Sequence, residues 1–262
     1  MKILYEFIPK LNFVEAAGNV KDLIDGFNIT DSASGIPAPS GTTCACVLKK
    51  MYPDKVTIPM LISNYKGPVE LGAAALAAEA MGVDGLLPDP GDPPKYGNLI
   101  RTKEDGSCEM LLDPDEILKY RRSTGPAEGV RDYLRNNVKI SKTQLGCLLT
   151  ARVPAEAAIK RMKDSWDFGF FLRLEPSTVP KLKEIGAECK RLGKPLYPYL
   201  IVSTPKNQKI LDRIGWPASA TMETAEKMVA DLEGSVTGVI ATCLGFAASD
   251  IELLGKLQKF RG

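Results

Sequence analysis

A glutamate inside an otherwise apolar segment is the first residue that could do chemistry. Glu6 lies in the run I-L-Y-E-F-I, from Ile3 to Ile8, whose composition favours a buried strand. Burial raises the pKa of a carboxyl group, so an inward-pointing Glu6 is suited to donate a proton near neutral pH. The alternative is a Glu6 that points to a solvated rim or pairs with a lysine.

A second acid, Asp92, lies in the segment D-P-G-D-P-P, from Asp89 to Pro94. Gly91 permits a close backbone approach, and the two prolines after Asp92 restrict its conformation. A rigid acid of this kind can face the N–H groups of a heterocycle, and the alternative is a stiff surface turn. The polar triplet Thr30-Asp31-Ser32 could likewise bind a ligand or form a turn.

Basic and aromatic side chains could hold the rest of a ligand. Arg161 belongs to a basic group with Arg152, Lys160 and Lys163, which could bind a cofactor phosphate or a carboxylate tail, or could form a solvated helix face. Tyr199 could line a pocket for a planar ring or stack inside the core.

The composition of the 262-residue chain limits the chemistry further. The chain has no histidine, which excludes Ser-His-Asp and Cys-His catalysis and His-ligated zinc. The 6 cysteines show no C-x-x-C spacing, so no metal site is predicted. The net charge of only +2 gives no sign of the strongly basic surface that binds nucleic acids. We expect a cytoplasmic protein, because there is neither a secretory signal nor an apolar run of the roughly 18 residues that span a membrane.

The elements that must position these residues alternate between short apolar runs and amphipathic helical stretches. The predicted strands are 3–8, 27–30, 56–62, 83–87, 145–151, 168–174, 196–202 and 239–242. Continuous apolar strands of this kind are typical of parallel sheets covered on both faces. Eight of them, separated by helical segments over about 250 residues, predict an α/β fold with a single (β/α)8 TIM barrel. A doubly wound open sheet is the alternative, but no glycine-rich phosphate turn follows the first strand.

The predicted helices have recognisable ends. Gly26 should terminate a helix over 11–25, Ser40 should cap a helix to about Lys50, and Pro68 should open a helix to Ala80. No linker or change of composition divides the chain, so residues 1–262 are expected to form one domain.

Several segments together resemble methylenetetrahydrofolate reductases. Y-E-F-I-P-K at 5–10 resembles the opening strand F-E-F-F-P-P of that family, and N-I-T-D-S-A-S-G-I-P at 28–37 resembles its V-T-D-S-P-S-G-x-P. G-V-D-G-L-L-P-D-P-G-D-P-P at 82–94 resembles its G-I-x-N-x-L-A-L-R-G-D-P-P. The order and spacing match over roughly the first 100 residues.

The resemblance implies a barrel enzyme of one-carbon metabolism that reduces methylenetetrahydrofolate, or a related methylene-tetrahydropterin, with FAD. Glu6 would be the proton donor, Asp92 would contact pterin and flavin, and Thr30 would lie by the flavin. The expected cofactor contacts are Thr30, Asp89, Gly91, Asp92, Tyr96 and Arg161. The expected catalytic residues are Glu6 and Asp92, and the expected substrate contacts are Glu6, Asp92 and Tyr199.

The sequence also departs from that family. Met60 stands where the family has a histidine beside the flavin, and Pro90 replaces an arginine. These departures leave open a tetrahydropterin-dependent methyltransferase acting with a corrinoid protein, or a non-catalytic subunit of a one-carbon complex. The chain could then be a homo-oligomer or the partner of another subunit.

Overall fold

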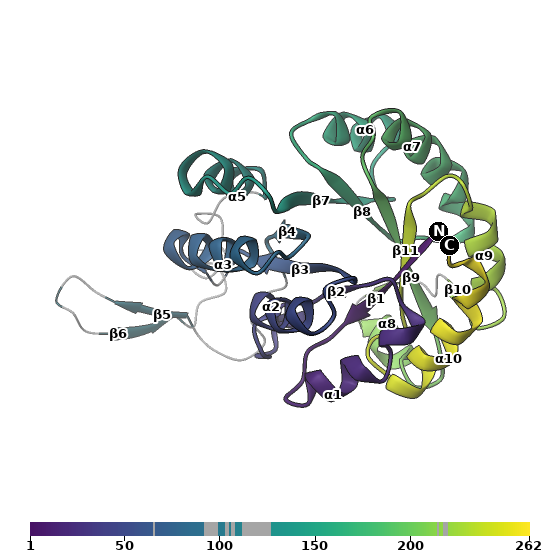
Figure 1. Ribbon diagram of the computed structural model, residues 1–262, viewed down its shortest axis with the longest axis horizontal. Helices are drawn as coiled ribbons and strands as arrows, with labels where there is room; N and C mark the ends of the chain where they lie inside the picture. Colours follow the sequence, from purple (N-terminus) through teal and green to yellow (C-terminus); the bar gives the residue numbers. More distant parts are fainter. Residues whose placement is uncertain are drawn as a thin grey trace.

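Eight parallel strands close into a barrel in the computed structural model, which describes residues 1–64, 66–91, 99–102, 105, 108–111, 127–213, 215–216 and 220–262 (Figure 1). In their order around the barrel the strands are β1 (Lys2–Phe7), β2 (Gly26–Ile29), β3 (Val56–Ile62), β4 (Gly85–Asp89), β7 (Gln144–Thr150), β8 (Phe168–Leu172), β9 (Leu196–Ser203) and β11 (Gly238–Thr242). The pairing of β8 with β9 closes the ring. The predicted (β/α)8 barrel is therefore confirmed.

Helices surround the barrel on its outer side (Figure 1). The α-helices are α1 (Phe13–Gly18), α2 (Gly41–Met51), α3 (Pro68–Ala80), α5 (Ala127–Tyr133), α6 (Ala155–Lys163), α7 (Val179–Arg191), α8 (Gln208–Arg213), α9 (Ala225–Leu232) and α10 (Ala247–Leu257). The described ranges also contain short helical turns, all 3-10 except the π-helical η3: η1 (Lys21–Leu23), η2 (Ala33–Gly35), η3 (Leu134–Val138), η4 (Pro176–Thr178) and η5 (Gln258–Phe260). The pair β5 (Leu99–Thr102) and β6 (Cys108–Leu111) forms an antiparallel hairpin outside the barrel, and the short β10 (Ala220–Thr221) pairs with β9.

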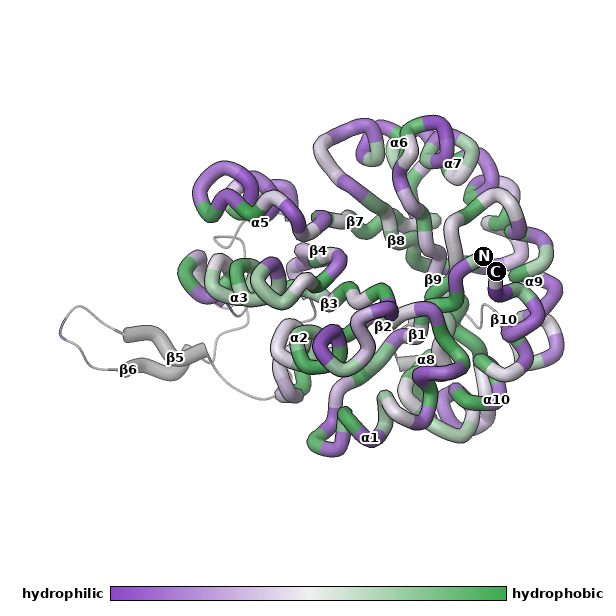
Figure 2. Tube along the Cα trace, viewed as in Figure 1, coloured by the Kyte–Doolittle hydropathy of each residue, from purple (hydrophilic) through white to green (hydrophobic). Residues whose placement is uncertain are grey.

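The apolar side chains form two separate layers. One fills the barrel and includes Leu4, Ile58, Phe168, Phe170 and Ile240, all of them buried. The larger layer lies between the strands and the helices. Figure 2 shows the consequence, because the strands at the centre are mostly hydrophobic while the surrounding helices alternate between hydrophobic and hydrophilic residues. Inward and outward side chains alternate along each strand, so residues of one strand reach both layers.

The strand and helix ends differ from expectation in a few places. β3 and α3 have the predicted bounds, and Ser40 caps α2 by accepting a hydrogen bond from Thr43 N–H at 3.4 Å. Gly26 is not a helix cap: it is the first residue of β2, and a Cβ there would lie 2.3 Å from the carbonyl oxygen of Val56. This glycine is required by the close approach of β2 to β3. The helix before it, α1, ends at Gly18 and not at residue 25 as predicted.

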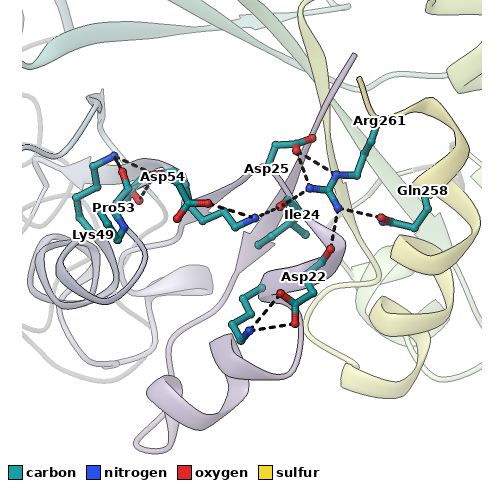
Figure 3. Close-up of polar contacts among 11 residues, drawn as sticks. Asp22, Ile24, Asp25, Lys49, Pro53, Asp54, Gln258 and Arg261 are labelled. Atoms are coloured by element: carbon teal, nitrogen blue, oxygen red, sulfur yellow. Dashed lines mark hydrogen bonds and ion pairs between the residues drawn. The ribbon is translucent and has the colours of Figure 1, made fainter.

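The end of the chain is fastened to the connection between β1 and β2 (Figure 3). Arg261 pairs with Asp25 at 2.9 Å and donates to the carbonyl oxygens of Asp22 and Ile24. Asp25 also accepts the backbone N–H of Ile3 at 2.8 Å, so one carboxylate joins the last residues to the first strand.

Candidate active site

A cavity of about 170 Å³ lies at the carboxyl ends of the barrel strands. Its walls come from β1, β3, β4, β9 and the loops after β2 and β4. The lining residues are Glu6, Thr30, Asp31, Ser32, Ala33, Met60, Ile62, Asp89, Gly91 and Tyr199. This volume is roughly that of five or six water molecules. It fits one reacting group of a small molecule, at the end of the barrel where enzymes of this fold hold their active sites.

Glu6 is the acid of this cavity, a half-buried side chain whose Oε2 is itself buried. Its Oε2 has no hydrogen-bond partner among the described residues. Burial raises the pKa of the Glu6 carboxyl from 4.5 to about 7, a hydrogen bond with Thr242 opposes this rise, and the charge of Asp250 adds to it. A carboxyl with such a pKa is suited to exchange a proton near neutral pH.

Tyr199 reaches the cavity from β9 and is held by a buried amide. Its hydroxyl donates to Oδ1 of Asn28 at 2.6 Å, while Nδ2 of Asn28 donates to the carbonyl oxygen of Ile58 at 3.0 Å. Burial and the negative charges of Glu6 and Asp89 raise the pKa of Tyr199 well above its usual range. The ring also packs edge-on to Phe170, with ring centroids 5.8 Å apart. Tyr199 thus both lines the cavity and stacks inside the barrel.

Asp31 lies beside the cavity as half of a largely buried ion pair with Lys66. The side chains are 5 % and 12 % exposed, respectively. Oδ1 of Asp31 also accepts the backbone N–H of Gly41 at the start of α2, 3.3 Å away. A carboxylate at this position is stabilised by the positive end of the helix dipole. Lys66 and the N-terminus of α2 therefore compensate the negative charge of Asp31, whereas Oε2 of Glu6 has no such partner among the described residues.

Asp89, the last residue of β4, and Gly91 form one side of the cavity. Oδ2 of Asp89 accepts the N–H of Gly91 at 3.1 Å, and Gly91 has a positive φ of +78°. A Cβ at Gly91 would lie 2.5 Å from Ile62, so glycine is required here by both the backbone and the neighbouring side chain. Asn64 donates to the carbonyl oxygen of Gly91 at 3.2 Å and ties this loop to the end of β3.

The structure brings together Glu6, Thr30, Asp89, Gly91 and Tyr199 of the expected site residues. Asp92 and Tyr96 lie outside the described residues. Arg161 does not line this cavity: it lies in a second cavity between β7, α5 and α6, where it pairs with Glu128 at 2.8 Å. Its guanidinium carbon lies 5.8 Å from the centre of the Trp166 ring. The charge of Arg161 is thus paired with Glu128, apart from the Glu6 cavity.

Sequence reasoning missed Asn28 and Lys66. The signal for Asn28 is present, since a polar residue inside the apolar run F-N-I resembles Glu6 in Y-E-F. Lys66 has no local signal, because it lies 35 residues from Asp31 and meets it only after β2 and β3 pair. Within the described ranges there is no group of three or more acidic or cysteine residues that could hold a metal ion. No helix in that part of the chain is long and apolar enough to cross a membrane.

Comparisons with known proteins support the fold and little else. No family model matches the chain, and no curated protein matches it. A solved structure from Aquifex aeolicus VF5 has a TM-score of 0.58 at 14 % identity, covering 98 % of this chain and 91 % of that one. A mutant tryptophan synthase alpha-subunit from Pyrococcus furiosus has a TM-score of 0.57 at 11 % identity, covering 97 % and 98 %. KGPDC from Streptococcus mutans has a TM-score of 0.51 at 11 % identity, covering 100 % and 99 %. At such identities the likeness is one of fold alone.

These findings overturn the resemblance to methylenetetrahydrofolate reductases. The structures of similar fold include tryptophan synthase alpha and KGPDC barrels, and no family model, a reductase model included, matches the chain. The expected one-carbon reduction, FAD, the tetrahydrofolate or tetrahydropterin substrate, and the methyltransferase and one-carbon-subunit alternatives are therefore wrong. The physical reason is that the matching segments lie at strand ends. A parallel barrel needs apolar strands followed by polar, glycine- and proline-rich turns there, whatever its reaction.

Proposed function

We propose that the chain is an enzyme that moves a proton to or from a small organic substrate, with Glu6 as its acid–base group. The observation that carries the proposal is the state of this carboxyl. Its pKa is raised to about 7 by burial, and its Oε2 is unpartnered within the described structure. An acid–base group works best when its pKa lies near the working pH. The presence of a tryptophan synthase alpha-subunit among proteins of this fold is compatible with an enzyme.

The residues around Glu6 support a role for Glu6 in proton transfer and for its neighbours in orienting the substrate. Met60 and Ile62 give the cavity an apolar wall, and burial of the Glu6 carboxyl raises its pKa. The Tyr199 hydroxyl donates a hydrogen bond to Asn28, which fixes its position and leaves its oxygen free to accept a hydrogen bond. Asp31 is compensated by Lys66, so it adds little net charge near Glu6. We therefore infer that Glu6 alone changes protonation during the reaction, while its neighbours orient the substrate.

The location and organisation of the protein follow as parts of the same proposal. The five cysteines whose side chains are described are unpaired, which suits a reducing compartment such as the cytoplasm. One closed barrel that runs from the first strand to the last supports a single domain over residues 1–262.

The acid state of Glu6 can be tested without knowing the substrate. Infrared difference spectra of the protein at pH 6 should contain the carbonyl band of a protonated carboxyl group, and this band should be absent from Glu6→Gln. Spectra that show Glu6 fully ionised at pH 6 would contradict its proposed role as the acid–base group.

Catalysis is tested by proton exchange. Small carboxylates and phosphate esters that carry a carbonyl or hydroxyl group are incubated with the protein in D₂O, and ¹H NMR follows deuterium entry at carbon or product formation. Glu6→Gln should slow any such reaction by about 100-fold or more. Glu70→Gln, an exposed glutamate at the start of α3, is the matched control and should leave the rate unchanged. Equal rates for wild type and Glu6→Gln contradict the proposal.

A further inference from the structure

Arg173, the first residue after β8, has an unusual backbone conformation. Its φ is +64°, in the left-handed region that disfavours every residue with a Cβ. A glycine would adopt this conformation at less cost, roughly 1 kcal/mol. Strained residues cluster at functional sites, so the strain makes Arg173 a candidate for one.

The side chain of Arg173 is held in place on an aromatic ring. Its guanidinium carbon lies 4.9 Å from the centre of the Trp216 ring, and its Nη1 donates to the carbonyl oxygen of Gly215 at 3.2 Å. Trp216 in turn packs against the apolar cluster inside the barrel, together with Leu172 and Leu244. The guanidinium is therefore fixed at the rim of the barrel, at the same end as the Glu6 cavity.

This guanidinium still has donors to offer. Arginine carries five N–H groups, and Gly215 takes one of them. No ion pair links Arg173 to a carboxylate in the described part of the chain, whereas Arg131, Arg135 and Arg161 all have acidic partners. A fixed, planar fork with free donors is the geometry that binds a carboxylate or phosphate group.

Arg173 and the acid Glu6 come from different sides of the barrel mouth. Around the ring, β8 is four strands from β2 in either direction, so Arg173 lies opposite the Thr30–Asp31 end of β2. The acids Glu6 and Asp89 lie on β1 and β4, while Asp31, near the end of β2, is already paired with Lys66. A molecule that crosses the mouth would meet the acid at one end and the arginine at the other.

We propose that Arg173, stacked on Trp216, binds an oxyanion of the substrate, a phosphate or a carboxylate, whose reacting end lies at Glu6. The substrate class is thus a small organic anion. The statement about the reacting end rests on the proposed function, but oxyanion binding at Arg173 can be measured by itself.

The probe for this site is inorganic phosphate, with acetate as the second probe, at constant ionic strength held by chloride. In a Trp166→Phe background, which leaves Trp216 as the remaining tryptophan, the fluorescence should change with saturation for at least one of the two anions, and the anion that binds more tightly identifies the group. Arg173→Gln should weaken that binding at least 10-fold. Absence of saturation with both anions overturns the proposal.

Two variants separate binding from folding and from general charge. Arg173→Gly removes the guanidinium and suits the φ of +64°, so the fold should be kept while binding is lost. Arg152→Gln removes an exposed arginine after the neighbouring strand β7, and it should bind the anion within about twofold of wild type. Equal losses in Arg152→Gln and Arg173→Gln overturn the site, because the effect would then be one of net charge.

Glu6→Gln keeps the two proposals apart. It should bind the anion as wild type does, since Arg173 is unchanged. If Glu6→Gln retains full catalysis, the proposed function fails while anion saturation that depends on Arg173 still supports this site.

Discussion

Burial of the Glu6 carboxyl raises its pKa, so this group titrates near neutral pH. The chain has no histidine, so Glu6 occupies the pH range in which histidine ordinarily acts. The barrel tolerates the buried acid because protonation removes its charge, and Thr242 supplies a hydrogen bond that favours the ionised form. The same carboxyl is therefore stable in the fold and ready to transfer a proton.

The stability of the protein should depend on pH through the titration of Glu6. The folded pKa of about 7 lies above the ordinary value of 4.5, so the folded state binds the proton more tightly than the unfolded state. The resulting stabilisation is complete below about pH 4.5 and is lost as the pH rises through about 7, with a total of about 3 kcal/mol. Urea unfolding of wild type and Glu6→Gln at pH 4, 6 and 8 should show their difference in free energy change by this amount. Parallel pH profiles for the two proteins contradict it.

Part of the candidate site is visible in the sequence at the level of single residues. Glu6 interrupts an apolar run and Gly91 lies close to Asp89, and both are local patterns. The partners are not local, since Tyr199 meets Asn28 across 171 residues and Lys66 meets Asp31 across 35. The closed ring decides which side chains share the cavity. Charge alone suggests Arg161 as a ligand contact, and the structure pairs it with Glu128 instead.

At the scale of elements, glycine and proline differ in how well they predict boundaries. Glycine commonly ends helices, yet Gly26 begins a strand, because it lies against the carbonyl oxygen of Val56 within the barrel. Pro68 marks a helix start correctly, because its fixed φ suits the first helical turn. Strand β4 ends at Asp89, two residues later than predicted, since its pairing with β3 continues to that residue.

The packing of β7 against β8 should depend on Gly146. A Cβ at Gly146 would lie 2.1 Å from Cε2 of Phe168, the buried ring on the neighbouring strand β8. We expect Gly146→Ala to lower the free energy of unfolding by about 1–3 kcal/mol, because the ring must move in a packed interior. Phe168→Leu in that background should restore part of the loss, as measured by urea unfolding.

A second glycine provides the control for this experiment. Gly255 lies in α10, where a Cβ would meet no atom within 4 Å, so Gly255→Ala should raise stability by up to about 1 kcal/mol. A Gly146→Ala protein as stable as wild type, or one that Phe168→Leu does not improve, would show that the two residues do not share this space.

For the whole molecule, the number and order of the barrel strands can be predicted from the sequence, but the reaction cannot. Eight apolar runs separated by helices have few other solutions, because parallel strands need a crossover between each pair. The hairpin β5–β6 is not predicted, since two four-residue strands outside the barrel leave no comparable pattern. The family resemblance is wrong because the segments that suggest it belong to strand ends, where many unrelated barrels look alike. A fold reached in this way says nothing about its chemistry.

The closure of the whole chain should depend on Arg261. Its guanidinium joins the end of the chain to Asp25, and Asp25 holds the N–H of Ile3, so the contact links the last turn to the first barrel strand. Loss of a partly buried charged hydrogen-bond group leaves Asp25 without this partner, and Arg261→Ala should lower the free energy of unfolding by about 2 kcal/mol. Arg261→Lys should fall between wild type and Arg261→Ala, because it keeps the charge without the planar fork. All variants are measured by urea unfolding at pH 7.

A surface arginine tests whether this loss is specific to the closing contact. Arg191 is exposed and pairs with Glu188 on the same helix, α7, so water screens the pair and the contact joins no distant segments. Arg191→Ala should therefore unfold at nearly the same urea concentration as wild type, because what stabilises the barrel at Arg261 is the connection between the two ends of the chain rather than the ion pair itself. Equal losses for Arg261→Ala and Arg191→Ala would mean that the contact does not close the barrel.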